Sequence, residues 1–78
     1  MIGYLRGTIL YKNEPDLLIE AGGVGFEVTA TSQAFRTLPG EGETGELHIH
    51  TLVREEELAL FGFASREERA MFELLMQV

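Results

Sequence analysis

The stretch Asp16–Ala30 has the sequence DLLIEAGGVGFEVTA and decides the expected fold. Apolar side chains alternate with polar or small ones on both sides of Gly22-Gly23, which is the pattern of two half-buried strands. A glycine pair suits a two-residue hairpin turn, because glycine adopts positive φ at no steric cost. We therefore expect a β-hairpin with Gly22 and Gly23 as its structural turn. Its core face is formed by Leu17, Ile19, Ala21, Val24, Phe26, Val28 and Ala30.

Upstream of this hairpin, the segment Ile2–Tyr11 is rich in Ile, Leu, Tyr and Thr. This composition predicts a long strand, and Gly3 and Gly7 within it indicate that the strand curls sharply. The segment Lys12–Asp16 contains Asn, Pro and Asp and predicts the turn that joins this strand to the hairpin.

Downstream, Thr31 and Ser32 are candidate N-caps of a short helix that ends at Pro39-Gly40, and Glu41–Gly45 is expected to be a loop. Two strands follow, the second at Leu58–Phe63. The first of them has a core face with Leu47, Ile49, Thr51 and Val53, and an outer face with Glu46, His48, His50 and Leu52. Five strands with a short helix between the third and the fourth are typical of an OB-fold barrel. The predicted fold is thus mainly β, with a five-stranded OB-fold barrel over residues 1–63.

Residues 64–78 are expected to form a linker and a C-terminal helix. Ser65 and Glu68 have the spacing of a capping box, in which the serine hydroxyl and the glutamate satisfy free backbone N–H groups. The apolar residues of this helix cover about 200° of its circumference, wider than one core requires. They are Met71, Phe72, Leu74, Leu75, Met76 and Val78. We therefore expect the helix to lead into a further domain of a longer protein, and to fray or be covered by a neighbouring molecule without it.

The composition limits the classes of partner. Thirteen acidic residues against six basic ones give a formal net charge of −7. Affinity for nucleic acid rests largely on neutralised phosphates, so this chain alone is expected to be a poor DNA binder. There is no cysteine, which fits a reducing compartment. No apolar run approaches the length of a membrane helix, so we expect a cytoplasmic protein without membrane contact.

The candidates for chemistry are weak. His48 and His50 share a strand face and would need a third ligand to hold a metal, so an outer polar pair is the favoured interpretation. The GGVG segment lacks the spacing of a phosphate loop and precedes a strand. The aromatic residues fit core packing better than base stacking. No combination of nucleophile, histidine and acid is present, so we expect no catalytic residue, no metal, no cofactor and no enzymatic activity.

The tetrapeptide Arg54-Glu55-Glu56-Glu57 is an unusual hairpin tip. Tight turns favour Gly, Asn or Asp, whereas this one places glutamates side by side, where their charges repel. One interpretation is a solvated turn that aids solubility. The other is a negatively charged probe directed at an anionic molecule or at a basic patch.

Several motifs together resemble the N-terminal domain of the RuvA family. They are the segments Met1–Gly3, Leu5–Gly7, Gly22–Val28, Val53–Glu56, Leu60–Phe63 and Glu67–Arg69. The resemblance covers the chain from end to end, with departures at Tyr4 and in the lower basic content, both expected at the surface. It implies an OB-fold barrel followed by a domain with helix-hairpin-helix motifs and a mobile C-terminal domain.

The resemblance also implies a function and partners. Members of this family are non-catalytic subunits of bacterial recombination and DNA repair that form homotetramers and hold four-way junction DNA open. They act with the ATPase RuvB, which binds the C-terminal domain, and with the resolvase RuvC. The acidic pin of the family corresponds to Glu55 and Glu56, with Arg54 and Glu57 flanking it and no role assigned to Glu57. The alternative hypothesis is an acidic OB-fold module that mediates protein contacts only.

Overall fold

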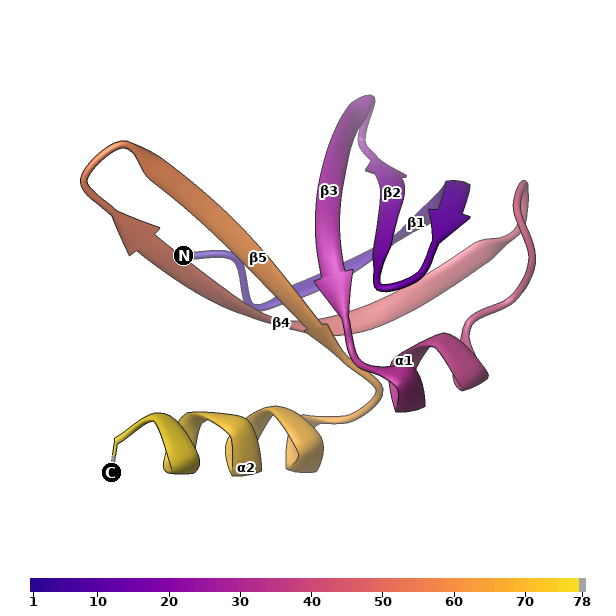
Figure 1. Ribbon diagram of the computed structural model, residues 1–78. Coiled ribbons are helices and arrows are strands. Elements are labelled where there is room, and N and C mark those ends of the chain that lie inside the picture. Colours follow the sequence, from indigo (N-terminus) through magenta and orange to yellow (C-terminus); the bar gives the residue numbers. More distant parts are fainter. Residues whose placement is uncertain (78) are drawn as a thin grey trace.

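The computed structural model describes residues 1–77 and has five strands closed into a barrel (Figure 1). The strand order is β1-β2-β3-β5-β4, with β3 and β5 parallel and the other neighbours antiparallel. This confirms the predicted OB-fold barrel, including the helix between the third and fourth strands. The elements are β1 (Tyr4–Asn13), β2 (Asp16–Ala21), β3 (Val24–Ala30), α1 (Ser32–Thr37), β4 (Thr44–Arg54), β5 (Glu57–Phe63) and α2 (Arg66–Met76).

β1 bends so that it can serve two neighbours. Its first half, Tyr4–Thr8, pairs with β4, and its second half pairs with β2. Gly7 lies at the bend, where a Cβ atom would be 1.9 Å from the carbonyl oxygen of Glu20. Gly7 is thus required by the close approach of β2, and the register of β1 against β2 shifts between Ile9 and Tyr11. Gly3 precedes the strand, and β1 continues to Asn13, so the expected turn is shorter than the sequence suggested.

The β2–β3 hairpin has the predicted turn. Gly22 and Gly23 have φ values of 61° and 85°, in the region that glycine favours. Of the predicted core face, Leu17, Ile19, Val28 and Ala30 are buried. Phe26 is half-buried and packs against the core cluster. The expectation for Val24 is wrong: this side chain is 53% exposed, because it lies beside the turn at the end of the ribbon.

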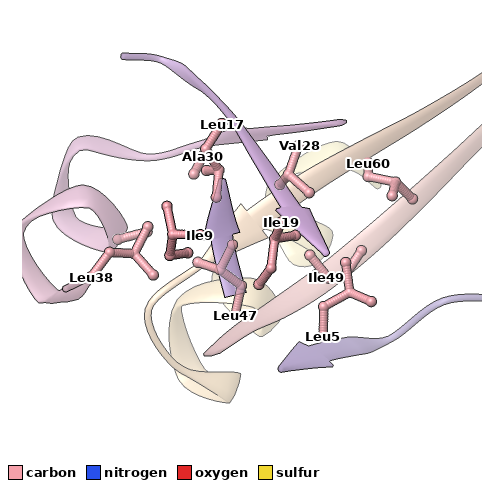
Figure 2. Close-up of a cluster of buried hydrophobic side chains, with 11 residues drawn as sticks. Leu5, Ile9, Leu17, Ile19, Val28, Ala30, Leu38, Leu47, Ile49 and Leu60 are labelled. Carbon is pink, nitrogen blue, oxygen red and sulfur yellow. The ribbon is translucent and has the colours of Figure 1, made fainter. Parts of the chain in front are cut away.

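The core is filled by aliphatic side chains from every strand (Figure 2). Leu38, which follows α1, belongs to the same cluster, so the short helix is held at the barrel by a buried residue. The helix begins at a cap in which the Thr31 hydroxyl accepts a hydrogen bond from the Ala34 N–H at 3.1 Å. Thr31 is thus the N-cap, and Ser32 is the first residue of the helix.

α2 begins at the predicted capping residue. The Ser65 hydroxyl accepts a hydrogen bond from the Glu68 N–H, whereas the Glu68 carboxylate accepts from the Ala64 N–H and not from the expected Ser65 N–H. The barrel leaves much of the apolar arc uncovered, as predicted, with Met71, Leu74, Leu75 and Met76 at least half exposed. Val78 lies outside the described residues. The domain boundary and the covering or fraying of this helix stay predictions.

Candidate functional site

β4 and β5 form a hairpin that extends beyond the other strands (Figure 1). The two strands pair continuously from His48 and Phe63 to Arg54 and Glu57. Their pairing with the rest of the barrel ends earlier: β1 reaches β4 only as far as His48, and β3 pairs with β5 at Phe61 and Gly62. The outer part of the hairpin, Leu52–Ala59, is called the acidic hairpin below.

The tip of the acidic hairpin carries the glutamates singled out in the sequence. Glu55 and Glu56 form the turn, while Arg54 and Glu57 are the last paired residues of β4 and β5. All four are exposed. Glu57, to which the sequence resemblance assigns no role, lies on β5 opposite Arg54. In water, two unit charges at 4 Å repel by about 1 kcal/mol, so the tip is a local source of negative potential.

The two faces of the acidic hairpin differ. On one face, Arg54 and Glu57 line a shallow depression together with Leu52, Ala59 and Phe61. On the other face, Val53 and Leu58 are 58% and 60% exposed. The predicted core face of β4 is buried through Thr51, but the prediction for Val53 is wrong. At that point the hairpin has left the barrel, and there is no core for the side chain to enter.

The base of the hairpin is held by contacts that sequence reasoning missed. The Thr51 hydroxyl donates to the carbonyl oxygen of Ile2 at 2.6 Å and accepts from the Ile2 N–H at 3.1 Å. Arg69 of α2 donates through Nη1 to the carbonyl oxygens of Gly3 and Ile49. These residues are far apart in the chain, and neither spacing nor composition signals such contacts.

The two histidines of β4 have different partners. His50 Nδ1 lies 2.8 Å from the Glu73 carboxylate, and the His48 ring packs against Tyr4 with 5.5 Å between centroids. In the described part of the chain, no three His, Cys, Asp or Glu side chains gather as a metal site would require. Gly22 and Gly23 lie at the tip of a separate ribbon, so the structure does not bring them to the acidic hairpin (Figure 1).

Tyr4 lies at the surface, as expected, and has a perturbed hydroxyl. It donates a hydrogen bond to the Glu46 carboxylate, and this bond raises the pKa of Tyr4 above that of an ordinary tyrosine. Desolvation and the charge of Glu46 act in the same direction, and Arg6 opposes them.

We expect Glu46→Gln to lower the pKa of Tyr4, because the neutral amide no longer favours the protonated phenol. The measurement is an alkaline titration by phenolate absorbance in a Tyr11→Phe background, where Tyr4 is the remaining tyrosine. The same titration curve for both proteins would contradict the prediction.

Comparison with known proteins identifies the family. The model of the RuvA N terminal domain matches residues 1–62. Proteins called "Holliday junction branch migration complex subunit RuvA" are 47% identical over 78 residues in Acidobacterium capsulatum and Laribacter hongkongensis, and 44% identical in Colwellia psychrerythraea. Each match covers 100% of this chain but only 37% to 39% of the relative. Neither helix within residues 1–77 is long and apolar enough to cross a membrane. With this match in sequence and a barrel of the expected topology, the chain belongs to the RuvA family and corresponds to its N-terminal domain.

Proposed function

We propose that this chain is the N-terminal domain of a non-catalytic subunit that binds Holliday junctions and supports branch migration in recombination and repair. The observation that carries the proposal is the acidic hairpin, whose exposed Glu55 and Glu56 lie beyond the barrel. We assign these two residues to the family's pin from the sequence resemblance. In this role the domain works in the cytoplasm within a homotetramer, with RuvB as the ATPase and RuvC as the resolvase. Gly22 and Gly23, at the β2–β3 turn, have only a structural role in this proposal.

The charge of the hairpin suits it to shape a junction without gripping it. A carboxylate repels a phosphate, and this repulsion is stronger where the surroundings partly exclude water. With four copies around a junction centre, eight carboxylates would face the strands that cross there. Such a ring keeps strands apart and directs them into separate arms. The attractive phosphate contacts must then come from outside the acidic hairpin.

The junction hypothesis is tested in a full-length RuvA protein that carries these 78 residues as its N-terminal domain. We expect it to bind a four-way junction at least about tenfold more tightly than a linear duplex of the same sequence, a difference of about 1.4 kcal/mol. Electrophoretic mobility shift at fixed salt measures both affinities. Equal affinities would remove the junction hypothesis and favour the alternative, an acidic OB-fold module for protein contacts.

A separate prediction concerns the 78-residue chain by itself. At physiological salt it should bind neither duplex nor junction DNA appreciably, because a net charge of −7 opposes the counterion release that drives such binding. Fluorescence anisotropy with labelled DNA is a direct measurement. A dissociation constant below about 1 μM for either DNA would contradict the account of the charge.

A further inference from the structure

We propose that Arg69 is the positioning residue that fixes the direction of the acidic hairpin by joining the base of that hairpin, at Ile49 of β4, to α2. The inference rests on the proposed function, since it explains how the pin is aimed. Arg69 Nη1 donates to the carbonyl oxygen of Gly3 at 2.9 Å and to that of Ile49 at 3.3 Å. The Gly3 oxygen also accepts from the Ile49 N–H at 2.9 Å. One guanidinium thus connects three parts of the chain at a single point. They are α2, β4 and the N-terminal segment, Met1–Gly3, which precedes β1.

This point lies at the base of the projecting hairpin. Two residues further along β4, Thr51 holds Ile2 through both of its backbone polar groups. Thr51 is buried, at 7% exposure, so these hydrogen bonds are shielded from competing water. The N-terminal segment is therefore fixed beside β4 just before the strand leaves the barrel at Leu52.

The attachment of α2 depends on few residues. Among the described residues of this helix none is buried, and the half-buried ones are Glu68, Arg69, Phe72 and Glu73. Glu68 is occupied by the cap of its own helix. The other three contact β4 and β5 and so help to set how the helix lies on the hairpin base.

Arg69, Phe72 and Glu73 contact neighbouring positions at the base of the β4–β5 hairpin. Arg69 and Glu73, four apart and so on one helix face, reach Ile49 and His50 of β4. Between them the Phe72 ring packs 4.9 Å from the Phe63 ring and 5.9 Å from the Phe61 ring of β5. Phe61 in turn lines the depression on the outer hairpin. α2 thereby contacts both strands of the hairpin at its base.

Arg69 is distinguished from its neighbours by an unmet donor. Its Nε is inaccessible to solvent and has no hydrogen-bond partner within residues 1–77. An unmet buried donor is destabilising. The guanidinium is thus oriented so that Nη1 meets the two carbonyl oxygens while the Nε–H is left without a partner in the described residues.

The test measures the spread of distances between the hairpin tip and the helix, without DNA. The chain contains no cysteine, so spin labels at Glu56→Cys and Gln77→Cys report the distance from the hairpin tip to the end of α2 by pulsed electron resonance. We expect Arg69→Ala to broaden the distance distribution about twofold, because the base loses one of its few attachments. Arg66→Ala, at an exposed position of the same helix, is the matched control and should keep the parent width.

A second variant keeps the test decisive if Arg69→Ala does not fold. Arg69→Met keeps an unbranched apolar side chain but has no N–H donor, so we expect a broadened width without the loss of packing that Arg69→Ala brings. If Arg69→Ala folds and has the parent distribution, the proposal is wrong. If it does not fold, a parent width in Arg69→Met overturns the proposal and a broadened width supports it. The junction assay on the full-length protein is independent, so either hypothesis can fail while the other stands.

Discussion

Replacing Gly7 by alanine is expected to destabilise the domain more than any other single methyl group added at a glycine. The new Cβ would lie 1.9 Å from the Glu20 carbonyl oxygen and 2.7 Å from its carbonyl carbon. Both are backbone atoms and cannot rotate away, so β1 and β2 must separate where β1 bends between its two partners. We expect a loss of at least about 3 kcal/mol of unfolding free energy. For a domain of this size that lowers the melting temperature by roughly 12–24 °C.

Thermal unfolding followed by circular dichroism measures this loss, and Gly25→Ala is the matched control. At Gly25 the added Cβ would lie 3.4 Å from a methyl group of Leu18, a side chain that can adjust. We expect its melting temperature to change by only a few degrees, roughly the effect of 0.5 kcal/mol. Similar melting temperatures for the two variants would show that β1 and β2 do not cross as closely at Gly7 as described.

Sequence periodicity predicted which face of each strand is buried but not where the barrel ends. The alternation in β2 and β3 correctly placed Leu17, Ile19 and Val28 inside. The same periodicity placed Val24 of β3 and Val53 of β4 there as well, although both are exposed. A period of two repeats along a strand whether or not another element covers it. The length of barrel that covers each strand depends on pairing between distant segments, which no local pattern reports.

The same limit applies to the candidate site. The charges of Glu55 and Glu56 were apparent from the sequence, because a turn of adjacent glutamates departs from ordinary turn chemistry. The direction of the hairpin was not apparent. It depends on Arg69 and Glu73, which analysis of the helix by its apolar residues left out, and on contacts such as the one from Arg69 to Gly3. Only the folded barrel brings these segments together.

The largest expected functional effect is that of reversing the charge at the hairpin tip. In the full-length protein, Glu55→Lys with Glu56→Lys should raise affinity for linear duplex by about tenfold or more at low salt, because lysines release counterions where carboxylates repelled phosphates. The preference for junctions should fall accordingly. Glu55→Gln with Glu56→Gln should also raise the affinity for duplex and lower the preference for junctions, but by less. Folding should be nearly unchanged in each, since exposed charges at a turn contribute little to stability.

The control for this experiment is Glu20→Lys with Glu27→Lys, which makes the same change of net charge at exposed positions of the β2–β3 hairpin. A general electrostatic effect would raise duplex affinity equally in both reversed proteins, whereas a pin at the junction centre makes the tip variant the stronger binder. The gain should also shrink as salt rises, because screening shortens the range of the charges. Branch migration with RuvB measures the consequence for strand separation. If the tip variants match the parent in junction affinity, duplex affinity and migration rate, Glu55 and Glu56 form only a solubilising turn, and the barrel fold stands without a pin.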